Sequence, residues 1–335
     1  MEIYDNIAIT SRIRLARNVE GLKYYTKLQS DVDANYIIGS VMKTLEKFDN
    51  FNFLRLKDLS LNECNALFEQ HLISKELIEN KDISGVAISE DGKIIVMINE
   101  EDHIREQCLE KGFNLYKPYR RLNEIDNEIL SSLPIAFDKD LGFITASPSN
   151  LGTGMRASVM VFLPALEMSG QIDELIKKAK ENGLTVRGVY GEGSRPLGQF
   201  YQISNQGSLG LDEYEIIDKV SDFIFEVCNK EKEARDLLLK NDYDNIKNIC
   251  LRAYGILTNC YVLDEEEMII LLSQIKLGQV LGFLEIKDDQ IYQKLYFEGA
   301  NANLKEIFEL YDKKKENILR AEYISNKIKE QVRRR

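Results

Sequence analysis

The sequence predicts an α+β fold, with an antiparallel sheet flanked by helices and a small, mostly helical C-terminal region. Two apolar runs, residues 83–89 and 93–98, surround Glu90-Asp91-Gly92, the pattern of a β-hairpin and therefore of antiparallel strands. Helical and extended patterns alternate through the first two thirds of the chain, whereas only helical patterns follow residue 245.

Apolar periodicity predicts the elements in chain order. Extended segments are expected at residues 8–18, 51–57, 141–146, 184–190 and 199–204, in addition to the hairpin strands. Helices are expected at residues 34–48, up to Leu67, near 122–130, at 159–168 and 172–181, and from Asp212, which forms a capping box with Glu215. C-terminal helices are expected at residues 246–256, 264–275, 304–311 and 318–332, before a solvated tail, Arg333–Arg335.

Composition limits the possible functions. A net charge of −11 and a pI of about 5.0 argue against a general nucleic-acid binder. No apolar run approaches the roughly 20 residues needed to cross a bilayer, and the N-terminus lacks a signal-peptide pattern. The 5 cysteines have no CxxC spacing, which indicates reduced thiols in the cytoplasm, and 2 histidines nearly exclude a multi-histidine metal site.

The segment Asn99–Arg105 directly follows the buried run 94–98. It holds three consecutive acids, then His103 and Arg105. Charges at the end of a buried strand are a typical place for chemistry, because the strand fixes the backbone while side chains project into a cleft. Two other interpretations are open: a turn with solvated charges, and a carboxylate cluster that binds a metal.

Two arginines near the N-terminus suit an anion. Arg12 and Arg14 are two residues apart, so on an extended segment both point to the same side. Two guanidinium groups on one side match phosphate oxygens. The alternative is an exposed basic edge strand.

Two further segments have the features of binding loops. In residues 147–158, Gly152 and Gly154 allow close backbone approach, small polar residues offer N–H donors to an anion, and Arg156 adds a charge. This segment lacks the Walker A and Rossmann spacings, and a plain turn is the alternative. Residues 191–196 form a charged loop in which Glu192 is either a movable carboxylate or a solvated one.

Together these segments resemble the phosphagen (guanidino) kinases. Five blocks occur in that family's order: Ser11–Arg14, Asn99–Arg105, Pro148–Arg156, Arg187–Glu192 and Gln202–Asn205. Creatine and arginine kinases carry a helical domain before the first block, which begins here ten residues into the chain. The additional helical region at the C-terminus is similar to that of the bacterial protein-arginine kinases.

The resemblance implies a role for each site residue. Arg12, Arg14, Arg105, Arg156 and Arg187 would hold the phosphates of ATP, with Mg²⁺ held mainly through those phosphates. Glu101 and Glu192 correspond to the two carboxylates that pair with the substrate guanidinium, and Glu101 is the expected base.

The chain departs from the family at Ser147. The family has a cysteine there, whose thiolate helps to seat the guanidinium. A serine hydroxyl is neutral and cannot supply that charge. The serine therefore implies either a lower activity or a substituted cysteine.

The resemblance also implies a cellular role. The expected reaction is transfer of the γ-phosphoryl group of ATP to arginine side chains of proteins, which marks them for Clp-type proteolysis in the stress response and protein quality control. The implied partners are an activator protein, a heat-shock repressor and a Clp ATPase or protease, besides a second copy of the chain in a homodimer. Two alternatives are a small-molecule guanidino kinase acting on free arginine, and a weakly active adaptor that binds phosphoarginine or a protease.

The domain boundary is expected in the charged segment 230–245. Residues 1–241 would form the phosphotransferase domain, and residues 242–335 a helical domain for dimerisation and regulation. Protein-arginine kinases are described there by an Arg-Asp-x-x-Arg-Ala motif that binds phosphoarginine. Arg320 and Ala321 fit this motif, whereas Glu316 and Asn317 do not, and Glu316 would repel a phosphate. The alternative is that Arg320 lies on a helix surface.

Overall fold

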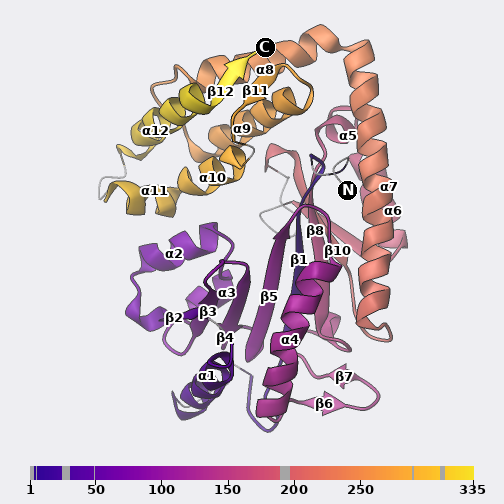
Figure 1. Ribbon diagram of the computed structural model, residues 1–335, viewed down its shortest axis with the longest axis vertical. Coiled ribbons are helices and arrows are strands. Elements are labelled where there is room, and N and C mark those ends of the chain that lie inside the picture. Colours follow the sequence, from indigo (N-terminus) through magenta and orange to yellow (C-terminus); the bar gives the residue numbers. More distant parts are fainter. Residues whose placement is uncertain are drawn as a thin grey trace.

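An eight-stranded antiparallel sheet organises the protein (Figure 1). The computed structural model describes residues 4, 6–24, 31–48, 50–188, 197–288, 290–309 and 314–335. The strand order is β2-β3-β4-β5-β1-β8-β10-β9, so the first strand lies inside the sheet. The strands are β1 (Ala8–Arg17), β2 (Phe51–Arg55), β3 (Gly85–Ser89), β4 (Ile94–Ile98), β5 (Ile104–Lys111), β8 (Met155–Phe162), β9 (Leu184–Gly188) and β10 (Phe200–Asn205).

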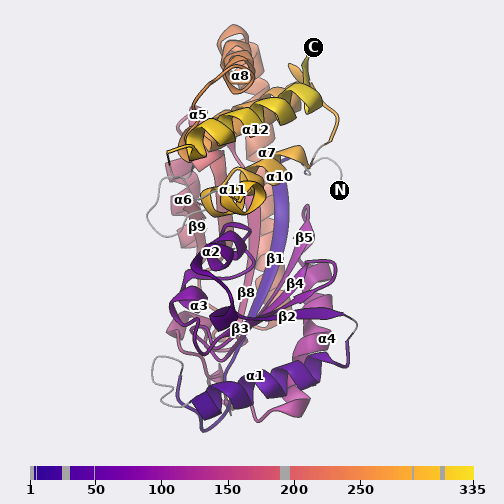
Figure 2. The ribbon, with the colours of Figure 1, turned by 90° about the vertical axis from the view of Figure 1, so that its left-hand side faces the viewer.

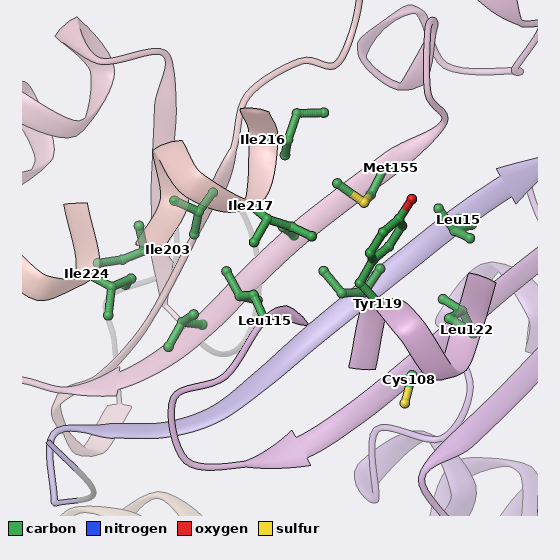
Figure 3. Packing of buried hydrophobic residues seen from close by; sticks show 14 of the residues in the cluster. Leu15, Cys108, Leu115, Tyr119, Leu122, Met155, Ile203, Ile216, Ile217 and Ile224 are labelled. Carbon is green, nitrogen blue, oxygen red and sulfur yellow. The ribbon is translucent and has the colours of Figure 1, made fainter. Parts of the chain in front are cut away.

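Four helices cover one face of this sheet and form the main core with it. They are α1 (Asp31–Leu45), α4 (Tyr116–Ser132), α6 (Ile172–Glu181) and α7 (Glu213–Asn241). Figure 3 shows the strand residues Leu15, Met155 and Ile203 packed against Leu122 of α4 and Ile217 of α7. Burying each such side chain stabilises the fold by roughly 1.5–3 kcal/mol.

The other face is divided into an apolar and a charged part. Two short helices, α2 (Leu61–Glu69) and α3 (Lys75–Glu79), cover β2, β3 and β4 through a separate apolar cluster. That cluster includes Leu77, Val86 and Met97. On β5, β1 and β8 the same face carries the arginines described below.

The C-terminal region is mostly helical and lies at the end of the sheet far from the hairpin of β6 (Phe137–Asp138) and β7 (Gly142–Phe143) (Figure 1). A small two-stranded sheet accompanies its helices. Its elements are α8 (Tyr243–Leu257), α9 (Glu265–Val280), β11 (Leu284–Ile286), α10 (Ile291–Glu298), α11 (Asn301–Phe308), α12 (Glu316–Gln331) and β12 (Val332–Arg334). The predicted fold class is confirmed.

The C-terminal region contacts the sheet domain through α11 and α2, which lie side by side in Figure 2. The Glu69 carboxylate at the end of α2 accepts hydrogen bonds from the backbone N–H groups of Ala302 (2.8 Å) and Asn303 (2.9 Å). These are N–H groups of the first turn of α11, which have no partner within the helix. Glu69 thus caps a helix of the other region.

Two predictions of secondary structure were wrong. The helix expected at residues 159–168 is strand β8 as far as Phe162, followed by the short helix α5 (Pro164–Met168). Strand β8 lies between β1 and β10 and is buried on both faces, so its apolar residues do not alternate with polar ones. The buried strand expected at 141–146 is only the two-residue β7, with Leu141 exposed.

Other elements had no counterpart in the sequence patterns. Among the described residues they are α3, β5, β6, α10, the pair β11–β12 and the 3₁₀ turns at Leu56–Asp58, Pro148–Asn150 and Leu197–Gln199. The tail expected to be solvated includes Arg333 and Arg334, which are exposed but belong to β12. No helix in the described part of the chain has both the length and the apolar character that crossing a membrane requires.

Candidate active site

Strand register places four of the predicted arginines on one face of the sheet. Arg14 on β1 lies opposite Arg156 on β8, and Ala16, two residues further along, lies opposite Arg105 on β5. Arg12 precedes Arg14 by two residues and points to the same side. Because residues directly opposite each other project from the same face, the four guanidinium groups share it. The alternative of an exposed edge strand at Arg12 and Arg14 is wrong, since β1 is paired on both sides.

The fifth arginine lies on the same face but further away. Arg187 of β9 is opposite Gln202 of β10, which is opposite Met160 of β8. Met160 is four residues from Arg156 and therefore shares its side of the strand. One strand, β10, therefore lies between the strand of Arg187 and that of Arg156.

Arg12 and Arg14 lie in a strongly positive environment. Burial, together with the charges of Arg105 and Arg156, lowers the pKa of Arg12 to about 10. Burial and the neighbouring arginines lower the pKa of Arg14 well below its usual value. In the part of the chain that the structure describes, neither side chain has a carboxylate partner. Such a cluster of like charges fits a polyvalent anion.

Arg105 and Arg156 have protein partners that orient them. Arg105 forms an ion pair with the fully buried Glu100. Arg156 donates hydrogen bonds from Nε (3.2 Å) and Nη2 (2.9 Å) to the Ser204 hydroxyl on β10. Both guanidinium groups are therefore held by residues of neighbouring segments.

The segment Asn99–Arg105 is an ordered turn with buried charges. Asn99 has a positive φ of 61° and donates from Nδ2 to the carbonyl oxygen of Ile83 (2.8 Å). The Glu100 carboxylate also accepts the backbone N–H of Glu101 (2.8 Å). The interpretation as a turn of solvated charges is therefore wrong.

Asp102 and His103 connect this turn to other segments. The Asp102 carboxylate accepts the Asn18 amide (2.6 Å) and the backbone N–H of Ala146 (2.7 Å). His103 accepts the Val19 N–H at Nδ1 (3.0 Å), so its Nε2 carries the proton and donates to the Lys23 carbonyl oxygen (2.8 Å). Burial lowers the pKa of His103. This histidine is therefore neutral and holds the backbone in place.

The hydrogen bond from Ala146 to Asp102 brings the segment with Ser147 next to the segment with Glu101. Glu101 is partly exposed, and burial, followed by the charges of Asp102 and Glu100, raises the pKa of its carboxyl group. The Ser147 hydroxyl lies 2.9 Å from that of Ser149. A carboxylate of raised pKa is better suited to accept a proton near neutral pH.

The predicted anion loop around Gly152 and Gly154 differs from the expectation. A Cβ on Gly152 would lie 2.6 Å from the carbonyl oxygen of Ser208, and one on Gly154 would lie 2.7 Å from that of Ala16. Both glycines have positive φ angles. The backbone that lies close to these glycines therefore belongs to other segments of this chain, not to a ligand. Of the residues in this predicted loop, Arg156 belongs to the arginine cluster, because it lies opposite Arg14.

One predicted site residue, Glu192, lies outside the described residues. Sequence reasoning also left several residues without a role, namely Asn18, Glu100, Asp102 and Ser204. Glu100, Asp102 and Ser204 lie in the motif blocks quoted above, and Asn18 ends the extended segment expected at residues 8–18. Only the tertiary contacts show which arginine or loop each one holds.

Arg320 is fully buried in the C-terminal region, so the alternative of a helix-surface position is wrong. Its guanidinium donates all five of its N–H groups to protein acceptors, at 2.5 to 3.3 Å. The acceptors are the carbonyl oxygens of Gly299 and Leu263, the amide oxygens of Asn301 and Asn317, and the carboxylate of Glu316. No N–H group of Arg320 remains for a phosphoarginine.

Comparisons with known proteins identify the family. The family model described as ATP:guanido phosphotransferase, C-terminal catalytic domain, matches residues 33–234, and that described as Protein-arginine kinase McsB C-terminal domain matches residues 243–335. A protein-arginine kinase of Clostridium acetobutylicum is 38% identical, over 98% of each chain. The chain belongs to the protein-arginine kinases of the guanidino phosphotransferase family. The resemblance found in the sequence is confirmed.

Another relative and two solved structures are also similar to this chain, over different shares of its length. A protein-arginine kinase of Caldanaerobacter subterraneus is 36% identical over 97% of this chain and 98% of its own. Among solved structures, the duplicated taurocyamine kinase of Schistosoma mansoni with transition-state analogue components matches with a TM-score of 0.61 and 29% identity. That match covers 68% of this chain and 33% of the other. Lombricine kinase matches with a TM-score of 0.60 and 25% identity, over 68% and 67% of the two chains.

Proposed function

We propose that this protein transfers the γ-phosphoryl group of MgATP to arginine side chains of proteins. The observation that carries the proposal is the strand register that gathers Arg12, Arg14, Arg105 and Arg156 on one sheet face, next to the turn that carries Glu101. The proposal is supported by the relatives named protein-arginine kinase, which match almost the whole chain.

The arginines would bind the nucleotide phosphates. Arg12 and Arg14 repel Arg105 and Arg156, and the negative charge of a triphosphate would relieve this repulsion. Arg187 would contact the same nucleotide from β9. Mg²⁺ would be held mainly through the phosphates, where it neutralises their charge. The described residues offer no group of three or more His, Cys, Asp or Glu side chains that could hold a metal.

Glu101 would activate the substrate arginine. A guanidinium is protonated in water, and a nitrogen lone pair must become available before it can attack phosphorus. Glu101 would pair with the guanidinium, orient it and accept its proton as the N–P bond forms and the bond between phosphorus and the ADP oxygen breaks. Glu192 would be the second carboxylate on the guanidinium, and Ser147 would lie beside it without the charge of a thiolate.

The wider role follows from the same proposal. Phosphorylated arginines would mark proteins for Clp-type proteolysis in the cytoplasm during stress. An activator protein and a heat-shock repressor would be partners of a homodimer. Ser147 favours one second candidate, an adaptor with weak activity that binds phosphoarginine or a protease.

The test is a phosphoarginine assay at neutral pH, in which mass spectrometry detects the acid-labile label on an unfolded, arginine-containing protein. The parent protein should label arginines, Ser147→Cys should label them faster, and Glu101→Gln should nearly abolish labelling while nucleotide binding is kept. Free arginine as the only acceptor should give little ADP, whereas rapid ADP release would indicate the small-molecule kinase. A parent protein that binds nucleotide but labels no protein would contradict the proposal. If Ser147→Cys also brought no gain while partner binding persisted, the adaptor would be favoured.

A further inference from the structure

A groove of about 290 Å³ lies between the β6–β7 hairpin and the turn that leads into α7. We call it the hairpin groove. It is lined by Phe137 and residues 140–143 of the hairpin, by Gly152 and Thr153, and by residues 209–213. Small-molecule sites usually measure about 300–1,000 Å³. The groove is at the lower end of this range, so it has room for a few side chains of a bound peptide. Figure 1 shows the hairpin at the end of the sheet opposite the C-terminal region.

The wall of the hairpin groove is apolar. Phe137, Leu141 and Leu209 are 62%, 44% and 54% exposed. The rings of Phe137 and Phe143 meet edge to face, with centroids 5.3 Å apart. Single exposed apolar residues are common, but several that converge on one groove mark an interaction surface.

The rim of the hairpin groove is acidic. Asp140, Asp212 and Glu213 line it, and none of the described lining residues is Lys or Arg. A partner with complementary charge therefore carries Lys or Arg beside an apolar side chain. A protein that presents a target arginine in a basic segment has this character.

One loop links the hairpin groove to the candidate active site, because Gly152 and Thr153 line the groove and the loop follows Ala146. Phe143 donates its backbone N–H to the Gly152 carbonyl oxygen (2.8 Å), and the Ser208 hydroxyl donates to that of Leu151 (2.8 Å). The same loop begins at Ser147 beside the Glu101 turn. The loop of residues 147–153 therefore runs from the proposed acceptor position to the groove.

We infer that the hairpin groove docks the substrate protein, by binding an extended segment in which a large apolar residue stands between basic residues near the target arginine. This inference rests on the proposed function. It adds a second recognition element, because Glu101, Glu192 and Ser147 would contact only the arginine that is phosphorylated. Substrates would be selected by the segment beside that arginine as well as by the arginine itself.

The experiment compares two series of single-arginine peptides. One series carries a Lys-Leu-Lys segment at increasing spacings on either side of the arginine, and the other carries Ser-Gly-Ser at the same places. The parent should show a lower KM for the Lys-Leu-Lys series. Leu209→Ser should raise that KM about ten-fold, the loss expected when one large apolar contact disappears. The kcat, the KM for MgATP and the rates with the Ser-Gly-Ser series should not change.

Two further variants support the assignment. Leu237→Ser is the matched control, because Leu237 on α7 is similarly exposed, at 56%, and does not line the groove. It should leave every constant as in the parent. Asp140→Lys, which reverses one charge of the rim, should raise the KM for the Lys-Leu-Lys series in the same direction as Leu209→Ser.

Binding of the labelled Lys-Leu-Lys peptides, followed by fluorescence anisotropy, separates this inference from the proposed function. If no peptide is phosphorylated but Leu209→Ser still weakens binding about ten-fold, the kinase proposal fails and the groove assignment holds. Equal binding of both series by the parent, or unchanged binding by Leu209→Ser, would overturn the groove assignment. Dissociation of an oligomer by Leu209→Ser, with an unchanged KM, would also overturn it and assign the groove to contacts between copies of this chain.

Discussion

Arg14 and Arg320 are two largely enclosed arginines with opposite surroundings. Arg320 gives all five N–H groups to protein acceptors, whereas Arg14 has no carboxylate partner among the described residues and faces Arg12, Arg105 and Arg156. Burial and like charges both disfavour the charged form of Arg14, and a bound anion would relieve that repulsion. An arginine that faces other arginines without a carboxylate therefore indicates an anion site, whereas one with five protein acceptors is structural.

The largest expected effect is on catalysis. Arg14→Met should lower kcat/KM about 10³-fold or more, the loss typical of a transition-state arginine in phosphoryl transfer. The free energy of unfolding without nucleotide should stay the same or rise, because burial and like charges already disfavour the charged form of Arg14. Steady-state kinetics and urea unfolding measure the two quantities. If Arg14→Met lowered both the stability and the activity, Arg14 would be a structural residue like Arg320.

Arg320 should show the reverse pattern. Arg320→Met should lower the free energy of unfolding by about 3–5 kcal/mol, because it leaves four carbonyl and amide acceptors without their donor and the buried Glu316 with Lys305 (3.4 Å) as its remaining ion-pair partner. The double variant Arg320→Met with Glu316→Leu should recover part of that loss. Urea unfolding provides the measurement. Normal stability combined with loss of phosphoarginine binding would show that Arg320 is a ligand residue after all.

A polyvalent anion that binds at the arginines around Arg14 should stabilise the folded protein. Pyrophosphate at about 100 times its Kd should add about 2.7 kcal/mol to the free energy of unfolding of the parent. Arg14→Met should respond much less, since the anion meets fewer guanidinium groups. Thermal unfolding with and without pyrophosphate checks this. A similar gain in both proteins would place the anion elsewhere.

The smallest effect concerns pH, through His71 beside the arginine face. Burial, and then the charge of Arg12, lower the pKa of His71 from 6.5 to about 4. Between these values the unfolded chain binds a proton that the native protein does not, so stability is complete above pH 6.5 and falls as the pH decreases. The loss should reach about 2 kcal/mol near pH 5.

His71→Asn is the control for this pH dependence. His71 has a φ of 59°, a conformation that asparagine adopts readily, so the variant should fold. Its stability should change less between pH 6.5 and about pH 5. An equal pH dependence in both proteins would show that other groups cause it.

Local patterns were informative where one face of an element is buried. The hairpin at Glu90–Gly92, the capping box of Asp212 with Glu215 and the extended segment of Arg12 and Arg14 all occur as expected. Strand β8 was mistaken for a helix because burial on both faces removes the period that distinguishes the two structures. The close approach that Gly152 permits was predicted to serve an anion. The sequence does not show that the backbone of Ser208 occupies this space instead.

By itself, the sequence determined the family, the fold class and the segments that carry charged side chains, because these depend on local periodicity and on motifs in a fixed order. Only the tertiary structure decided which charges have partners. Strand register placed Arg14 opposite Arg156, while the packing of α12 enclosed Arg320 among five acceptors. Hydrogen bonds between segments distant in the chain depend on atomic positions that residue identity alone does not specify. An arginine is therefore a candidate ligand-binding residue at position 14 and a structural residue at position 320.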